Sequence, residues 1–110
     1  MLQKWPGALT IIVNTKAVPG ESAASTIAFR CPGDQWLRKV ISLCKAPIYS
    51  TSVNRSGQPV LDTQASIIKE FQPQVDLIVK DGDKKGALPS TLVSITDGAV
   101  KILRQGSVEV

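Results

Sequence analysis

Residues 50–59, with the sequence STSVNRSGQP, concentrate hydrogen-bonding side chains directly after the apolar segment 46–49. Hydroxyl groups stand there beside the amide of Asn54 and the guanidinium of Arg55, groups that can hold a polar ligand. An apolar run typical of a buried strand, followed by such a cluster, indicates a binding site at the end of the strand. A turn without any ligand also explains the segment, because Asn, Ser, Gly and Pro are the ordinary residues of turns.

Histidine is absent from the chain, which excludes Ser-His-Asp and Cys-His catalysis and zinc bound through histidine. The two cysteines, Cys31 and Cys44, lack the spacing of metal ligands, and we expect both to be reduced core residues of a cytosolic protein. The 13 Lys and Arg residues outnumber the 9 Asp and Glu residues, for a net charge of +4. This mild positive charge suits a phosphate-bearing partner, either a nucleotide or RNA.

Size and composition predict one globular domain over residues 1–110, with 43% hydrophobic and 20% charged residues. No apolar run approaches the roughly 18 residues that a membrane span needs. The segment MLQKWPG also lacks the apolar stretch of a signal peptide. We therefore expect a cytoplasmic protein without a membrane segment.

The positions of the polar cluster and of the other candidates depend on the elements around them. Apolar residues at helical spacing predict helices over 35–45, capped by Asp34, and over 63–71, capped by Asp62 or Thr63. Runs of β-branched and apolar residues predict strands over 8–14, 26–32, 46–54, 75–82, 90–95 and 99–104. The Asp97-Gly98 pair predicts a tight primed turn between the last two strands. This order of elements predicts an α/β domain with a mixed sheet.

The first strand begins almost at Met1, with no element before it. Six strands and two helices leave much of the sheet uncovered, so we expect an exposed apolar face or edge strand. Self-association, or a partner or further segment that covers this surface, is the expected consequence.

Five segments then occur in a familiar order: WPGALT, TIAFRCP, SVNRSG, STLVSI and ILRQG. Together they resemble the YrdC-like family, whose best-known members are the threonylcarbamoyl-AMP synthases. The resemblance spans nearly the whole chain and implies an open twisted mixed β-sheet with flanking helices. Family members are longer and begin with a Lys-x-x-x-Arg type motif that grips the triphosphate. Nothing here matches that motif, so the resemblance implies a domain truncated at its N-terminus, with weak or no activity by itself.

The family reaction combines L-threonine, bicarbonate and ATP into threonylcarbamoyl-AMP and pyrophosphate. A transferase then passes the threonylcarbamoyl group to tRNA, so the partners of that pathway, and tRNA or double-stranded RNA itself, are implied partners. The chemistry requires orientation and charge neutralisation from Arg, Lys, hydroxyl groups and magnesium, and it needs no histidine.

The resemblance also assigns roles to individual residues. Arg30 lies in an otherwise apolar strand, where an unpaired charge is costly, and its fork suits the carboxylate of threonine. The implied threonine-binding residues are Arg30, Ser50 and Ser90, and the implied ATP-binding residues are Thr26, Ser52, Asn54 and Arg104. Two positions depart from the family pattern, Val53 in place of Ala and Val60 in place of a small polar residue.

Two other functions remain open at this point. The first is a non-catalytic YrdC-like module that binds RNA or a nucleotide. The chain has only two Trp, two Phe and one Tyr, most at expected core positions, which disfavours a single-strand RNA binder. The second is the carbamoyl-adenylate branch seen in hydrogenase maturation, whose usual neighbouring segments have no counterpart in this sequence.

Overall fold

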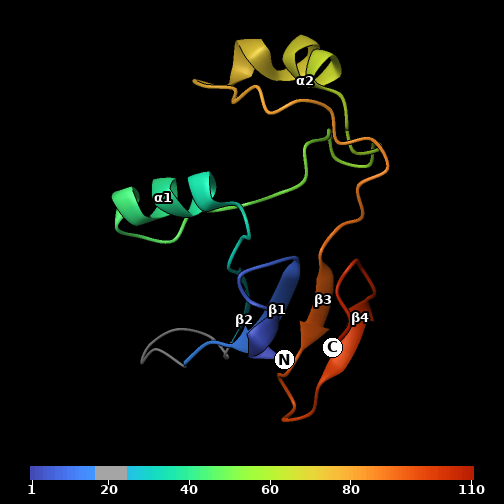
Figure 1. Cartoon of the computed structure of the whole chain (residues 1–110). Coiled ribbons are helices and arrows are strands. Elements are labelled where there is room, and N and C mark those ends of the chain that lie inside the picture. Colours follow the sequence, from blue (N-terminus) through green and yellow to red (C-terminus); the bar gives the residue numbers. More distant parts are fainter. Residues whose placement is uncertain (17–24) are drawn as a thin grey trace. The chain divides into compact units, whose positions relative to one another are not determined.

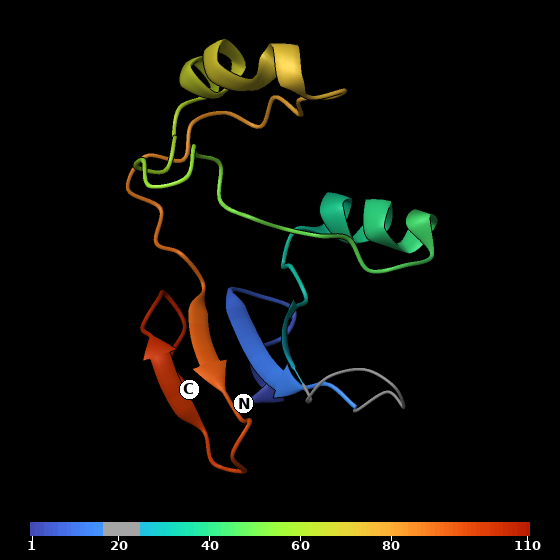
Figure 2. The ribbon, with the colours of Figure 1, turned by 180° about the vertical axis from the view of Figure 1, so that it is seen from behind.

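The computed structural model describes residues 1–16 and 25–110. Their strands form one open sheet in the order β2-β1-β3-β4, as Figure 1 shows from one side and Figure 2 from behind. The strands are β1 (Leu9–Asn14), β2 (Thr26–Arg30), β3 (Thr91–Ser94) and β4 (Lys101–Arg104). β1 pairs antiparallel with β2 and parallel with β3, and β4 is antiparallel to β3. The predicted α/β fold with an open mixed sheet is confirmed.

The chain divides into two compact units. Unit 1 contains residues 1–47 and 88–110 and includes the whole sheet, so both ends of the chain contribute to it. Unit 2 contains residues 48–87. That residues 1–110 form a single domain stays a prediction.

Alternation along the strands gives the sheet of unit 1 two different faces. Thr10 lies opposite Arg30 on β2 and Leu92 on β3, so these residues share one face, here called the Thr10 face. The other, apolar face contains Leu9, Ile11 and Val93, which are at most 3% exposed and form the core of the described residues. Central strands are thus buried on the apolar face.

The two helices begin where their caps were predicted. In α1 (Gln35–Cys44) the carboxylate of Asp34 accepts a hydrogen bond of 3.0 Å from the backbone N–H of Leu37. In α2 (Gln64–Phe71) Thr63 is the cap, and its hydroxyl accepts from the N–H of Ser66. Each cap satisfies a donor that the first helical turn leaves open. Neither helix is long and apolar enough to cross a membrane, and no other helix among the described residues is.

Short 3-10 helices occupy Leu2–Lys4 and Gln72–Gln74. The helices contain no fully buried residue, so their expected buried faces are only partly formed. Cys31 is half-buried and Cys44 is exposed, and both are free thiols. The expectation that Cys44 is a core residue is therefore wrong, because the end of α1 is exposed.

Two predicted strands, 46–54 and 75–82, are irregular in the structure. Both segments are rich in apolar residues, yet Tyr49 is fully exposed and Leu77 is 79% exposed. β-propensity mostly reflects packing and pairing with neighbours, and neither segment has a strand beside it in the described sheet. The prediction of six strands is wrong for this reason.

The turn between β3 and β4 differs from the predicted primed type. Of the residues in this turn, Gly98 alone has a positive φ, of 84°, whereas a type I′ turn needs two such residues. The N–H of Gly98 instead donates to the carbonyl of Ile95, and the carboxylate of Asp97 accepts from the N–H of Ala99. The hairpin itself is confirmed, but an Asx-type contact and one left-handed glycine close it.

The segment after β4 folds back on the start of β3. Thr91 is fully buried, and its hydroxyl accepts from the N–H groups of Gly106 and Val108 while donating to the carbonyl of Val108. A side chain on Gly106 would lie about 2.6 Å from backbone atoms of Ser90 and Thr91. The glycine of the ILRQG segment is therefore required by the close approach of two backbone segments, which fixes the residues around Ser90.

The edges of the sheet expose large apolar side chains. Ile27 and Phe29 on β2 are 42% and 41% exposed, and Ile102 on β4 is 48% exposed. Each edge strand has a single neighbour among the described residues. We expect the purified chain to self-associate as its concentration rises, because apolar surface and open strand edges favour association. Sedimentation velocity over a concentration series checks this, and a monomer at every concentration would contradict it.

Candidate ligand-binding site

Thr10, Ser90 and Arg104 form a hydrogen-bonded cluster in unit 1, here called the Ser90 cluster. The hydroxyl oxygens of Thr10 and Ser90 are 2.7 Å apart. Arg104 donates from Nε and Nη2 to the carbonyl oxygen of Ser90, at 3.1 and 2.9 Å, and from Nη2 to the Ser90 hydroxyl at 3.3 Å. Two predicted site residues that are 14 positions apart in the sequence thus contact each other directly.

Ser90 is held at both its backbone and its side chain, and only 9% of its surface is exposed. The charged fork of Arg104 makes strong, directional hydrogen bonds, which restrict the motion of the groups it contacts. Ser90 and Arg104 were predicted to contact different ligands, threonine and ATP. Their contact means that any ligand of one lies near the other.

Arg30 is opposite Thr10 in the ladder between β1 and β2, so it belongs to the Thr10 face. Its Nε donates to the carbonyl of Gly7 at 3.2 Å, which connects β2 to the WPG segment. No carboxylate pairs with Arg30 among the described residues. The internal ion pair that would explain this arginine structurally is therefore not seen in that part of the chain.

Thr26 lies at the other end of β2, opposite Asn14, and is exposed. It alternates with Arg30 along the strand in steps of two, so both side chains are on the same face of the sheet. Unit 1 contains four of the predicted site residues, namely Thr26, Arg30, Ser90 and Arg104. Three of them, Arg30, Ser90 and Arg104, are near the same end of β1.

The remaining predicted residues, Ser50, Ser52 and Asn54, belong to unit 2. The Ser52 hydroxyl donates to the side-chain oxygen of Asn54, and the Asn54 amide donates to the carbonyls of Arg55 and Gln58. The N–H of Gln58 also donates to the carbonyl of Arg55, closing a turn. Both the side-chain nitrogen and the side-chain oxygen of Asn54 form hydrogen bonds within this loop. For Asn54 this supports the interpretation of residues 50–59 as a turn without a ligand.

Arg55, which the sequence offered as a possible ligand-binding group of residues 50–59, joins this loop to α2. It pairs with Glu70 through Nε, donates to Gln74 at 3.3 Å and lies 5.2 Å above the ring of Phe71. Such a combination of ion pair and cation–π contact stabilises the loop against the helix. Arg55 is thus a structural residue of unit 2.

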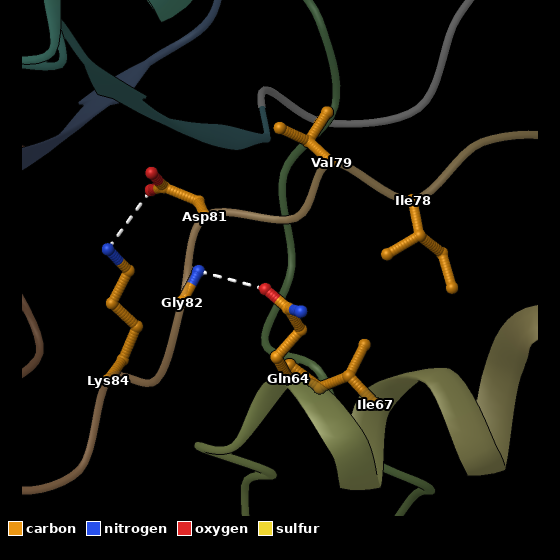
Figure 3. Close-up of a pocket in the computed structure, with 7 residues that line it drawn as sticks. All are labelled: Gln64, Ile67, Ile78, Val79, Asp81, Gly82 and Lys84. Carbon is orange, nitrogen blue, oxygen red and sulfur yellow. Dashed lines mark hydrogen bonds and ion pairs between the residues drawn. The ribbon is translucent and has the colours of Figure 1, made fainter.

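Unit 2 also contains a small pocket between α2 and residues 78–84, drawn in Figure 3. Its volume is about 160 Å³. The Gln64 side chain accepts from the N–H of Gly82 at 3.1 Å, and Lys84 pairs with Asp81 at 3.0 Å. Ligand pockets are usually about 300–1,000 Å³, so this one is too small for a nucleotide.

Comparison of this chain with known proteins identifies its family. The family model named Sua5/YciO/YrdC, described as "Telomere recombination", matches residues 1–106. The chain belongs to the Sua5/YciO/YrdC family. This confirms the resemblance that the five segments indicated.

Relatives of this Sua5/YciO/YrdC chain include named synthases. A threonylcarbamoyl-AMP synthase of Pyrococcus abyssi is 29% identical over 105 residues, which are 93% of this chain and 31% of that protein. A candidate threonylcarbamoyl-AMP synthase of Methanocaldococcus jannaschii is 33% identical over 106 residues, 96% of this chain and 50% of that protein. The chain therefore spans 31% and 50% of the lengths of these two relatives.

A solved structure supports the same grouping. A double-alanine variant of Sua5 from Pyrococcus abyssi superposes with a TM-score of 0.76 at 25% identity, over 97% of this chain and 34% of that one. The fold of the Sua5/YciO/YrdC chain is thus found within a longer relative.

The sequence analysis did not identify Thr10 as a member of the Ser90 cluster. The signal was present, since Thr10 ends the WPGALT segment, but only the pairing of β1 with β3 brings it to Ser90. The statement that most aromatic residues are in the core is also wrong. Three of the five are exposed, Phe29 by 41%, Trp36 by 58% and Tyr49 fully, so the argument against RNA binding from buried aromatics loses its basis.

Proposed function

We propose that this chain provides L-threonine- and ATP-contacting residues of a threonylcarbamoyl-AMP synthase. The family match over residues 1–106 and the names of the relatives support this activity at the level of the family. The observation that most favours it for this chain is the Ser90 cluster beside Arg30 on the Thr10 face. Two arginines and two hydroxyl groups are suited to bind carboxylate and phosphate groups.

In this proposal Arg30 and Ser90 bind the carboxylate of L-threonine. The Nη nitrogens of Arg30 have no hydrogen-bond partner among the described residues, because its contact with Gly7 uses Nε. A planar fork with two such nitrogens can bind a carboxylate bidentately. Ser50 is exposed in unit 2 and remains a proposed additional threonine contact.

Arg104 is the proposed phosphate contact, together with Thr26, Ser52 and Asn54. Its Nε and Nη2 contact Ser90, which leaves Nη1 for a phosphate oxygen of ATP. A guanidinium carries a positive charge on a planar set of donors, so it can neutralise charge at the phosphates during the reaction. The Asn54 amide is the weakest member of this set, because its groups are already used within its own loop.

The proposed reaction needs no histidine. The ammonium group of threonine first loses a proton to solvent, and the neutral amine attacks bicarbonate with loss of water. The resulting carbamate oxygen then attacks the α-phosphorus of ATP. Pyrophosphate is the leaving group, and threonylcarbamoyl-AMP is the product. Arginine and hydroxyl donors would align the reactants and neutralise the negative charge that accumulates at the phosphates.

Magnesium would accompany ATP in such a reaction and shield its phosphates. Within residues 1–16 and 25–110, no three acidic or thiol side chains come together as a metal site. The donors present therefore do not fit a metal site formed by these side chains alone. No step of the proposed reaction is assigned to the metal for this reason.

The threonine-binding part is tested by replacing Arg30. In nuclear magnetic resonance titrations of the labelled chain, L-threonine should produce saturable shifts at Arg30 and Ser90. Arg30→Ala should weaken this binding roughly 10- to 150-fold, because a hydrogen bond to a charged group contributes about 1.5–3 kcal/mol. Lys101→Ala provides a control, since it removes an exposed cation of β4 whose partner Asp97 is 3.9 Å away.

Equal threonine affinity for Arg30→Ala and the unsubstituted chain would contradict the assignment of Arg30. Absence of saturable shifts in the unsubstituted chain up to high millimolar threonine would contradict the proposed function itself. Pyrophosphate release from ATP that needs both L-threonine and bicarbonate would extend the proposal from binding to the complete reaction. Binding of tRNA or of transferase partners is a further proposal that the same labelled chain can test.

A further inference from the structure

Two potential hydrogen-bond donors of this chain lie beside the Ser90 hydroxyl. Arg104 Nη2 donates to it at 3.3 Å, and the Thr10 hydroxyl oxygen lies 2.7 Å away. A serine hydroxyl has one proton to donate and two lone pairs that accept. Because Arg104 occupies one lone pair, only two arrangements with Thr10 remain.

In the first arrangement Thr10 donates to the second lone pair of Ser90. The Ser90 proton is then not used by Thr10 or Arg104 and can be donated to a ligand. In the second arrangement Ser90 donates its proton to Thr10 and has one lone pair left for a ligand. A carboxylate only accepts hydrogen bonds, so the first arrangement alone allows Ser90 to bind one.

We infer that Thr10 is a positioning residue that directs the Ser90 proton toward the carboxylate of the bound amino acid. This inference rests on the proposed function, in which that carboxylate belongs to L-threonine. The nearby charges of Arg104 and Arg30 favour an anionic group at this position. Thr10 itself does not need to contact the substrate.

The position of Thr10 suits this role. It lies in β1, which is paired on both sides, with β2 and with β3, so its backbone is fixed. Threonine is β-branched, which restricts rotation of its side chain. Its hydroxyl is therefore held in place before a ligand arrives, and the Ser90 hydroxyl is held by Thr10 and Arg104 together.

The test compares Thr10→Val, which keeps the shape but removes the donor, with Thr10→Ser, which keeps the donor. L-Threonine and L-threoninol, which lacks the carboxylate, are titrated into each labelled chain. We expect Thr10→Val to weaken L-threonine binding about 5-fold, as the loss of a neutral hydrogen bond predicts. Thr10→Ser should restore the affinity, and L-threoninol should bind both variants equally.

Thr96→Val is the matched control. Its hydroxyl also pairs with a serine hydroxyl, that of Ser94 at 3.0 Å, but beyond the other end of β3. This control should leave the affinity for L-threonine unchanged, which separates the role of Thr10 from a general loss of hydroxyl pairs. Thermal unfolding of all variants shows whether the sheet remains folded.

Each outcome decides between the inference and its alternatives. Unchanged L-threonine affinity in Thr10→Val overturns the role of Thr10 while the proposed function stands. Equal weakening for L-threonine and L-threoninol also overturns it, because the hydroxyl then serves a group other than the carboxylate. Failure of Thr10→Ser to restore affinity shows a packing role instead. An unsubstituted chain that does not bind L-threonine overturns the proposed function and this inference together.

Discussion

Gly106→Ala should destabilise unit 1 by about 3 kcal/mol, the upper end of the usual cost of inserting an atom into a packed region. A β-carbon at this position would lie 2.6 Å from the carbonyl carbon of Ser90 and from the backbone nitrogen of Thr91. Backbone atoms cannot move aside as a flexible side chain can. The strain would also disturb the buried Thr91 hydroxyl, which accepts from the N–H of Gly106. Urea unfolding followed by circular dichroism measures the loss.

Gly33→Ala is the control for this substitution. A β-carbon on Gly33 would meet nothing closer than 3.7 Å, an ordinary van der Waals contact. Its stability should therefore stay within about 1 kcal/mol of the unsubstituted chain, as for most surface changes. If Gly106→Ala were as stable as Gly33→Ala, the segment after β4 would not approach β3 as closely as described.

Arg104→Ala should impair both proposed ligands at once. It removes the hydrogen bonds that hold the carbonyl and hydroxyl of Ser90, and it removes the proposed phosphate contact. Losing a charge-assisted contact to phosphate predicts ATP binding weaker by roughly 10- to 150-fold. L-Threonine binding should also decrease, because Ser90 loses its support. Isothermal titration calorimetry with each ligand measures both effects.

Arg104→Lys distinguishes charge from geometry. Lysine keeps the positive charge but lacks the planar fork, so it cannot contact Ser90 through two nitrogens and a phosphate through a third. We expect it to recover part of the ATP affinity and little of the L-threonine affinity. Full recovery of both affinities by Arg104→Lys would show that only the charge at this position matters.

Local signals in the sequence predicted the elements whose formation depends on nearby residues. The helices α1 and α2 were predicted to within one residue at each end, because Asp34 and Thr63 are caps that act on their own first turn. The strands β1 to β4 were predicted from runs of β-branched and apolar residues, and each of them has a partner in the sheet. Segments 46–54 and 75–82 were predicted wrongly, since a strand also needs a partner that no local pattern specifies.

In the candidate site, too, features that depend on nearby residues were easier to predict than contacts between distant segments. Arg30 was assigned through the family resemblance, and the apolar residues around it in the sequence supported a functional role. The structure places it on a strand whose residues are exposed, so burial does not explain its role. The contact between Ser90 and Arg104 could be anticipated only through the family resemblance. Thr10 was missed because its contact with Ser90 spans 80 positions and depends on the parallel pairing of β1 with β3. Asn54 has the right chemistry for a ligand, but the turn uses its hydrogen-bonding groups.

The parallel pairing of β1 with β3 also has a consequence for the time at which the sheet can form. β1 ends at Asn14, and β3 begins at Thr91, so the central pair of the sheet joins two segments that are far apart in the sequence. During synthesis, β2 is the one partner that β1 can have among the described strands until residues 91–94 have emerged from the ribosome. A two-stranded sheet is marginally stable in water. Contacts of such long sequence separation also make folding slow, so Ile11 and its apolar neighbours stay exposed for longer while the sheet is incomplete.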